Sequence, residues 1–381
     1  MNMGKNLFAL LIALTVLATG LTSKTKYRPC MKICKKLNLG RCFRVCRIVK
    51  DCTIWKSCWE NCTSSAATIT ATVLKGCLQE CKVKFVKIVN NVSSSAEGPV
   101  FTMDGNFYMV SYKGGEILEI NLTNHQSSLL VGYKGRPTGS QCDHDNNIWV
   151  ADMRLGLLKV FQNGTFHQIA TKDNNNDTLQ GFNDLIFDYH GNLWLTAPAG
   201  LIAPHPFERS KKEPFGSVYC YKMTGELTKV STGYVFPNGI AVQHDKDGTP
   251  MKLIFGVDRN ATLWSFDIVG HCQIENKTVW GSLPVNSSPD GMDFDEEGDL
   301  IVANYNTGHL YVFGPNGGPP ILKIKCPFVY ATNIHFKPNS KELYITESES
   351  NSLWKIQWKS KGMKQYCETP ELRGRYGRGG G

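Results

Sequence analysis

Residues 191–196 read G-N-L-W-L-T, a turn pair followed by four residues typical of a β-strand. The pattern has five further copies, and a second strand-like run usually follows each copy: G-N-F-Y-M-V (105–110), N-N-I-W-V-A (146–151), M-K-L-I-F-G (251–256), G-D-L-I-V-A (298–303) and K-E-L-Y-I-T (341–346). The copies recur at intervals of about 41 to about 59 residues, and a period of this size with several short strands is typical of propeller blades. The six copies therefore predict an all-β fold, a six-bladed β-propeller.

A propeller must close, since an open sheet edge invites pairing with other chains. The segment 84–89, K-F-V-K-I-V, alternates like a strand and precedes the first repeat. We expect it to complete the last blade beside the C-terminal strands. The propeller domain is thus predicted to span residues 83–370, and the Gly- and Arg-rich tail at 371–381 is predicted to be disordered.

The composition of the 381 residues, 41% hydrophobic and 20% charged, supports a large core and excludes global disorder. The net charge of +9 is concentrated near the N-terminus, because residues 24–90 hold 15 Lys and Arg against three acidic residues. The remaining body is net negative, which argues against a nucleic-acid-binding protein. No internal apolar run reaches the roughly 18 residues that a membrane helix needs.

Residues 1–23 have the pattern of a secretory signal peptide, with Lys5, an apolar run at 7–18 and a small-residue cleavage site at 18–20. An uncleaved membrane anchor is the alternative. The eight N-x-S/T sequons also favour passage through a glycosylating compartment. We therefore expect a secreted, extracellular glycoprotein. The sequon asparagines are Asn61, Asn91, Asn121, Asn163, Asn176, Asn260, Asn276 and Asn286.

Residues 24–82 hold nine of the 14 cysteines. Eight form C-x3-C pairs, whose members share one face of a helix, and we predict a small basic helical module closed by disulfides. Zinc binding is the alternative. The ninth, Cys52, is left to pair with another chain or with Cys272. The positive charge of the module would suit docking to an acidic glycan or membrane surface, but a disulfide-stapled helical appendage without such a role is the favoured interpretation. The pairs are Cys30/Cys34, Cys42/Cys46, Cys58/Cys62 and Cys77/Cys81.

Six residues hold one shared position in the repeats, four residues before a core residue of the innermost strand. Innermost strands of a propeller begin near its axis, so these side chains should face one another. Two carboxylates and two amides form a set of hard oxygen ligands that suits Ca²⁺ better than Zn²⁺. The alternative is that the Asn and Asp residues only cap turns beside glycine. The predicted ligands are Glu97, Asn183, Asn238 and Asp290, with Thr138 and Thr332 between them.

A second pair of polar residues shares another position in the repeats. Asp293 and His335 each immediately precede the core Phe of adjacent blades five and six. They should lie side by side, deeper along the axis. Either they form a buried hydrogen bond or they bind a second ion with a backbone carbonyl. The residues alone favour the hydrogen bond.

Four motifs carry a family resemblance: E-G-P-V-F (97–101), F-N-D-L-I-F-D (182–188), F-P-N-G-I-A-V (236–242) and P-D-G-M-D-F-D (289–295). They are similar to the gluconolactonase/regucalcin-like group of calcium-dependent hydrolases, which includes calcium-dependent phosphotriesterases. The resemblance covers about residues 84–370. It does not cover the signal or the cysteine-rich module.

The resemblance implies roles for individual residues. Glu97, Asn183, Asn238 and Asp290 match the ligands of the family's catalytic calcium, and Asp290 also matches a proposed nucleophile. The rival view is that the metal activates a water. Asp293, the Ile334 carbonyl and His335 match a second, structural calcium site, which reverses the preference for a hydrogen bond. Asp184 is assigned to the second shell of the catalytic calcium. Arg209, Tyr305 and Thr332 match substrate-binding positions of the pocket wall, whereas Ser348 and Lys211 depart from the family pattern.

The expected activity is therefore calcium-dependent hydrolysis of organophosphorus esters of the fluorophosphate type. We expect a monomer with two Ca²⁺ sites that acts on a small molecule and has no nucleic-acid partner. The alternatives are a lactonase resembling gluconolactonase, or a non-catalytic extracellular binding propeller.

Overall fold

The computed structural model of the chain describes residues 80–81, 83–92, 94–205, 208, 213–258 and 261–370. The predicted signal, the four C-x3-C pairings, Cys52, Arg209, Lys211 and the tail at 371–381 lie outside the described residues. The side chains of Glu80 and Cys81 also lie outside them. Within the described part, no helix has the length and hydropathy needed to cross a membrane.

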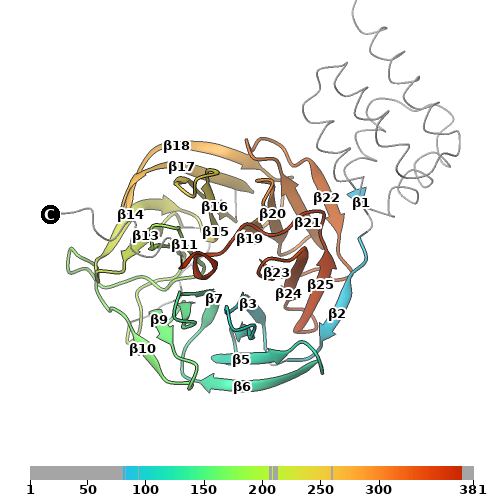
Figure 1. The fold of residues 1–381 in the computed structure, drawn as a ribbon. Coiled ribbons are helices and arrows are strands. Elements are labelled where there is room, and N and C mark those ends of the chain that lie inside the picture. Colours follow the sequence, from blue (N-terminus) through green and yellow to red (C-terminus); the bar gives the residue numbers. More distant parts are fainter. Residues whose placement is uncertain are drawn as a thin grey trace, which may run out of the picture. The chain divides into compact units, whose positions relative to one another are not determined.

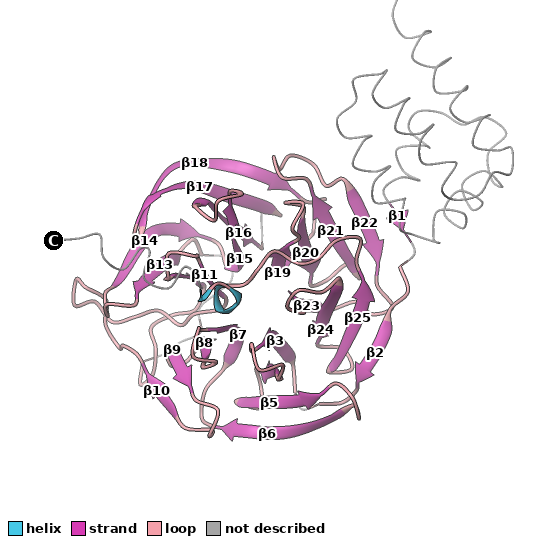
Figure 2. Ribbon diagram, viewed as in Figure 1, coloured by secondary structure: helices cyan, strands magenta, loops and turns pink. Residues whose placement is uncertain are grey.

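Six four-stranded antiparallel units surround a common centre, as predicted (Figures 1 and 2). We number these blades one to six in the order of their innermost strands. In blades one to four the chain runs from the innermost strand to the outermost, so strands such as β6 and β18 form the rim in Figure 1. The order places the starts of β3, β7, β11, β15, β19 and β23 around the axis.

The strands of blades one to three follow chain order. Blade one holds β3 (Ala96–Phe101), β4 (Phe107–Ser111), β5 (Glu116–Asn121) and β6 (Gln126–Gly132). Blade two holds β7 (Pro137–Cys142), β8 (Ile148–Asp152), β9 (Gly156–Val160) and β10 (Phe166–Gln168). Blade three holds β11 (Leu185–Phe187), β12 (Asn192–Ala197), β13 (Gly216–Lys222) and β14 (Leu227–Tyr234).

Blades four to six repeat this order, with one exception at the closure. Blade four holds β15 (Pro237–His244), β16 (Pro250–Val257), β17 (Thr262–Gly270) and β18 (Gln273–Ser282). Blade five holds β19 (Pro289–Phe294), β20 (Leu300–Asn304), β21 (His309–Phe313) and β22 (Leu322–Lys325), and β1 (Glu80–Cys81) pairs parallel to β22. Blade six holds β23 (Ala331–Phe336), β24 (Glu342–Glu347), β25 (Ser352–Gln357) and β2 (Val86–Val89).

The closing strand lies where the sequence predicts it. β2 pairs antiparallel with β25, so blade six combines the start of the propeller with its last strand. Ile88 and Val89 are buried against Phe107 and Leu353 in one hydrophobic cluster. The blade cores contain the residues used to align the repeats, because Phe101, Cys142, Phe187, Phe294 and Phe336 are all at most 2% exposed.

Residues 362–369 form a strap on the face of the ring opposite the starts of the innermost strands. The strap contains η1 (Tyr366–Glu368), a 3₁₀ turn that lies near the ring centre in Figure 2. The Met363 N–H donates to the Phe294 carbonyl at 2.8 Å. The Tyr366 ring stacks on Phe187 with centroids 4.7 Å apart. These contacts join the C-terminal segment to blades three and five.

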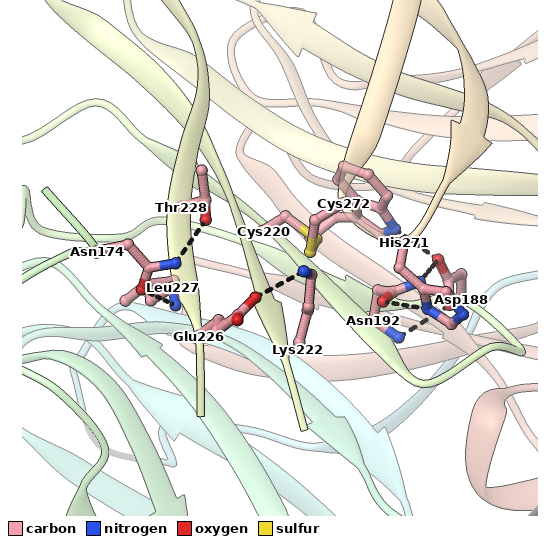
Figure 3. Close-up of a disulfide and its surroundings, with 11 residues drawn as sticks. Asn174, Asp188, Asn192, Cys220, Lys222, Glu226, Leu227, Thr228, His271 and Cys272 are labelled. Carbon is pink, nitrogen blue, oxygen red and sulfur yellow. Dashed lines mark hydrogen bonds and ion pairs between the residues drawn. A yellow bond between two sulfur atoms is a disulfide. The ribbon is translucent and has the colours of Figure 1, made fainter. Parts of the chain in front are cut away.

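One disulfide within the described residues corrects a sequence-based alternative. Cys220 of β13 is bonded to Cys272, in the turn between β17 and β18 (Figure 3). The alternative of a Cys52–Cys272 pair is therefore wrong, because the neighbouring blade brings Cys220 within 5.4 Å of Cys272, Cα to Cα.

Candidate active site

A β-bulge lies at each predicted ligand that belongs to a strand. Glu97, Asn238 and Asp290 are the second residues of β3, β15 and β19. The strand register shifts between Glu97 and Val100, between Pro237 and Ile240, and between Pro289 and Met292. A bulge bends its strand and changes the direction of a side chain. It therefore suits residues whose side chains must point toward the axis and not to either face of the sheet. Asn183 lies two residues before β11, where its N–H donates to the Thr196 carbonyl at 2.8 Å.

The carboxyl groups at this end of the axis are crowded. Burial, followed by the charges of Asp290 and Asp184, raises the pKa of Glu97 well above its usual value, while a backbone hydrogen bond from Gly98 lowers it. Burial also raises the pKa of Asp184 to about 7, against backbone donors at Leu185 and Ile240 and a hydrogen bond with Asn333. A bound cation would remove the repulsion between these carboxylates.

One amide oxygen at this site has no partner. Asn238 is 8% exposed, and its buried Oδ1 atom makes no hydrogen bond. Leaving such an oxygen unsatisfied costs free energy unless an ion or another donor meets it. Together with the carboxylates of Glu97 and Asp290 and the amide of Asn183, it gives a donor set that fits Ca²⁺. No group of three or more His, Cys, Asp or Glu residues in the described part is arranged to hold a metal, and this candidate set combines carboxylate with amide oxygens.

The residue after each aligned position explains how the side chains fit around the axis. A Cβ on Gly139 would overlap Asp184 Oδ1, and a Cβ on Gly291 would overlap the side chain of Asn333. Gly139 and Gly291 thus leave room for the side chains of Asp184 and Asn333, whereas Gly98 and Gly239 allow close approach of neighbouring backbone. The sequence analysis missed Asn333, although the same alignment moved by one residue would have found it. The six residues are Gly98, Gly139, Asp184, Gly239, Gly291 and Asn333.

The two threonines at the aligned positions connect neighbouring blades. Thr138 Oγ1 lies 3.3 Å from the Ala151 carbonyl and 3.4 Å from the Phe182 carbonyl. Thr332 is buried, and its hydroxyl donates to the Ala96 carbonyl at 2.7 Å. Both side chains therefore hold adjacent innermost strands together. A substrate contact by Thr332 stays a prediction.

Tyr305 lies beside the candidate ligands and is 39% exposed. Burial of part of the side chain raises the pKa of Tyr305, a hydrogen bond with Ser348 lowers it, and the charges of Asp290 and Glu97 raise it further. The Tyr305 ring also lies 5.1 Å from that of Tyr330, centroid to centroid. The hydroxyl groups of Tyr305 and Ser348 thus lie together near the carboxylates, where the family resemblance implies a pocket wall.

The second predicted site is buried deeper along the axis. His335 Nδ1 lies 3.9 Å from Asp293 Oδ2, too far for the hydrogen bond that the residues alone favoured. Asp293 instead accepts hydrogen bonds from the Phe336 N–H at 3.0 Å and the Gln365 side chain at 3.1 Å. Burial raises the pKa of Asp293 to about 7 and lowers that of His335 to about 4, so the imidazole is neutral at pH 7. A calcium ion at this site stays a prediction.

A small cavity on the axis connects the two groups of residues. Asp184 and Asn333 line it on one side, and Asp293 and His335 line it on the other. Gln365 of the strap donates a hydrogen bond to Asp293, although it is far from the cavity-lining residues in sequence. No repeat position marks Gln365, so the sequence analysis had no signal for it.

Residues 95–349 match the family model described as the SMP-30/gluconolactonase/LRE-like region. The chain belongs to this family. It is 48% identical over 300 residues to diisopropyl-fluorophosphatase from Loligo vulgaris, which covers 75% of this chain and 95% of that protein. A lactonase, drp35, from Staphylococcus aureus strain MW2 is 23% identical over 66% of this chain and 78% of its own length. This member of the SMP-30/gluconolactonase family is thus an enzyme, a hydrolase.

Solved structures of the family share the fold of the chain. A regucalcin from Agrobacterium tumefaciens superimposes with a TM-score of 0.63 at 17% identity, covering 75% of this chain and 98% of that one. A putative gluconolactonase superimposes with a TM-score of 0.62 at 18% identity, covering 74% and 94%. The six-bladed propeller is therefore confirmed for the part of the chain that the structure describes.

Proposed function

We propose that this protein is a secreted, calcium-dependent hydrolase of organophosphorus esters of the fluorophosphate type. The observation that supports it best is the unsatisfied Asn238 Oδ1 beside two crowded carboxylates at the propeller axis. The 48% identity to a diisopropyl-fluorophosphatase supports the substrate class.

The chemistry follows from the residues at the axis. Ca²⁺ held by Glu97, Asn183, Asn238 and Asp290 would polarise a phosphoryl or carbonyl oxygen as a Lewis acid. Asp290 then has one of two roles. As a nucleophile, its carboxylate oxygen attacks phosphorus, fluoride leaves, and water hydrolyses the acyl phosphate. As a positioning group, it orients a water that attacks phosphorus directly.

The decisive experiment is fluoride release from diisopropyl fluorophosphate, with and without a calcium chelator. Activity that requires calcium and returns when calcium is restored supports the proposal. Absence of fluoride release from a folded, calcium-loaded protein would contradict it. A single turnover in ¹⁸O-labelled water separates the two roles of Asp290. Water that attacks the acyl carbon of an Asp290 acyl phosphate places label in the Asp290 carboxylate, whereas water that attacks phosphorus directly places label in the first product.

Lactone hydrolysis is the second candidate activity. It is favoured by the hydroxyl pair of Tyr305 and Ser348, which adds hydrogen-bonding groups beside the carboxylates. A lactone offers several oxygen acceptors to such a wall. Parallel assays with diisopropyl fluorophosphate and gluconolactone compare the two by kcat/KM, and a higher value for the lactone would reassign the substrate class.

The second site, at Asp293, Ile334 and His335, is proposed to hold a structural Ca²⁺. A buried carboxylate and a neutral imidazole are suitable ligands beside a carbonyl oxygen. Calcium analysis of the purified protein should give two ions per chain, and one ion in the His335→Ala variant.

Secretion and glycosylation are supported by the positions of the sequons. All six sequon asparagines whose side chains the structure describes are exposed: Asn91, Asn121, Asn163, Asn176, Asn276 and Asn286. We expect a monomer that leaves the cell with N-linked glycans, which enzymatic deglycosylation and light scattering would test. Retention on immobilised heparin, eluted by salt, would test docking of the basic module at residues 24–82 to an acidic glycan.

A further inference from the structure

A histidine pair lies on the face of the ring opposite the candidate active site. His190 is in the turn between β11 and β12, and His271 is in the turn between β17 and β18. Their ring centroids are 5.6 Å apart, with the ring planes inclined by 41°. His271 is exposed and His190 is half-buried. Two imidazole rings at this spacing can place one nitrogen each on a common ion, since metal–nitrogen bonds are about 2.0–2.1 Å long.

A chain of hydrogen bonds fixes the tautomer of His271. The Asn192 side chain donates through Nδ2 to Asp188 Oδ2 at 2.8 Å, and a carboxylate can only accept. The amide is therefore oriented with Oδ1 toward His271 Nδ1, 3.0 Å away (Figure 3). Because Oδ1 accepts, Nδ1 carries the proton and Nε2 carries a lone pair. A histidine whose other ring nitrogen donates to a fixed oxygen, here the Asn192 amide oxygen, has the support that metal-ligating histidines usually have.

The supporting carboxylate is itself rigidly held. Asp188 is fully buried and accepts hydrogen bonds from the Asn192 N–H at 2.9 Å and from Trp194 Nε1 at 2.9 Å. Burial, aided by the charge of His271 and opposed by that of Asp188, lowers the pKa of His190. The lowered pKa favours the neutral imidazole of His190, which is the form that binds a metal ion.

The disulfide joins the two blades that carry the histidines. Cys272 directly follows His271, and its bond to Cys220 anchors the β17–β18 turn of blade four to β13 of blade three (Figure 3). His190 belongs to blade three. The spacing of the two rings is thus set by a covalent link between blades, which reduces the entropy that a ligand would otherwise have to overcome.

A nearby third histidine is not available for the same ion. His244 Nε2 accepts the Tyr189 N–H at 3.1 Å, so its Nδ1 carries the proton of the neutral ring. Burial lowers the pKa of His244 to about 3, and the ring stacks on Tyr189 with centroids 3.7 Å apart. No group of three or more His, Cys, Asp or Glu residues in the described part is arranged to hold a metal, so an ion between these two imidazoles would complete its coordination with water.

We propose that His190 and His271 form a binding site for a divalent transition-metal ion, Zn²⁺ or Cu²⁺, that clamps blades three and four. Imidazole nitrogen favours these ions, whereas Ca²⁺ prefers oxygen ligands. The site is therefore chemically distinct from the two calcium sites proposed above and does not depend on them.

Zinc binding to the full chain is measured by equilibrium dialysis in saturating Ca²⁺, for the parent and for His190→Ala, His271→Ala and His125→Asn. His125 is exposed in a turn of blade one, and asparagine suits its positive φ of 61°, so this variant is the matched control. His190→Ala and His271→Ala should each remove one bound zinc ion per chain or raise its Kd at least tenfold. The control should match the parent. Unchanged zinc binding in both alanine variants would overturn the proposal.

Electron paramagnetic resonance of the Cu²⁺-loaded protein gives a readout independent of affinity. Two imidazole ligands should produce superhyperfine splitting from two equivalent nitrogens, and each alanine variant should reduce it to one or none. A parent spectrum without imidazole nitrogen, or one that is identical in both variants, would contradict the assignment. Any zinc that persists in the variants belongs to another part of the chain.

Discussion

Asp290 combines a ligand position with the placement expected of the attacking group. The Asp290→Asn substitution keeps an oxygen but removes the charge, so we expect hydrolysis to fall by at least about a hundredfold, the loss typical for removal of one electrostatic stabiliser. Fluoride release and calcium content are measured together. Asp247→Asn, at an exposed turn position, is the matched control. Wild-type hydrolysis by a folded Asp290→Asn protein would refute the role of Asp290.

Gly239 is required by close packing between innermost strands. A Cβ at this position would overlap the Asp290 carbonyl oxygen, which belongs to rigid backbone. We expect Gly239→Ala to cost about 1–3 kcal/mol of unfolding free energy, the usual range for overpacking, and to lower activity by displacing β19. Urea unfolding measures the first effect. Gly132→Ala is the control, since its nearest neighbours would be 3.9 Å from the added carbon. Equal stability of the two variants would argue against this packing constraint.

Asp184 should make the metal-free protein sensitive to pH. Its pKa rises from about 3.9 in an unfolded chain to about 7 in the fold, so the native state binds more protons between these values. Ionisation of Asp184 thus destabilises the fold as pH rises from about 4 to 7. In a chelator, the melting temperature of Asp184→Asn relative to the parent should increase over this window.

The same comparison has two internal checks. Asp247→Asn, at an exposed position, should show no such trend. Saturating calcium should reduce the trend for Asp184→Asn, because a cation favours the ionised carboxylates of the parent. A constant difference in melting temperature between pH 4 and 7 would show that Asp184 ionises normally.

At the residue scale, the repeats predicted which positions are equivalent. Glu97, Asn238 and Asp290 share one position in their blades, and the structure places each of them at an irregularity of its strand, whereas their role as ligands stays a prediction. Asn333 and Gln365 were missed. The position of the Asn333 side chain depends on the absence of a side chain at the neighbouring Gly291. Gln365 reaches Asp293 only because the strap crosses this face of the ring. Such contacts depend on packing between distant segments, which periodicity does not record.

At the scale of elements, the Cys220–Cys272 disulfide joins two blades across 52 residues of sequence. Removing a cross-link of this length should cost about 2–4 kcal/mol, chiefly because the unfolded chain gains freedom. The Cys220→Ala/Cys272→Ala double variant should lose this amount in urea unfolding. Cys142→Ala, which removes a buried free thiol, controls for the loss of a buried sulfur. If the double variant and the control lose equal stability, the cross-link contributes nothing.

Elements differ in how well their sequences predict them. Each strand of the six-fold pattern follows a turn and consists of β-branched, aromatic or other apolar residues. Strands such as β12 and β20 were therefore predicted from local residues. The closing strand β2 was also predicted, because a ring demands a partner for β25. The strap and its 3₁₀ turn were not, since their conformation comes from contacts with Phe294 and Phe187.

At the scale of the whole molecule, calcium should raise the stability of the propeller. An ion that binds only the native state stabilises it by about 2.7 kcal/mol at a hundredfold excess over its Kd. We expect the melting temperature to rise with calcium concentration, and His335→Ala to lose part of that rise while keeping calcium-dependent activity. His167→Ala, at an exposed position in β10, is the matched control. A melting temperature that does not respond to calcium would count against a structural ion.

Blade six contains the first and last strands of the ring, and this has a consequence for synthesis on the ribosome. β2 emerges early, but its partner β25 is made only after nearly the entire propeller. At typical rates of about 5–20 residues per second, β2 waits for a period on the order of tens of seconds. During that time its edge can pair with β25 of a neighbouring chain whose own β2 is not yet in place, with the same hydrogen bonds as within one chain. Crowded polysomes should therefore yield strand-exchanged dimers of this protein, and slower initiation of translation should yield fewer of them.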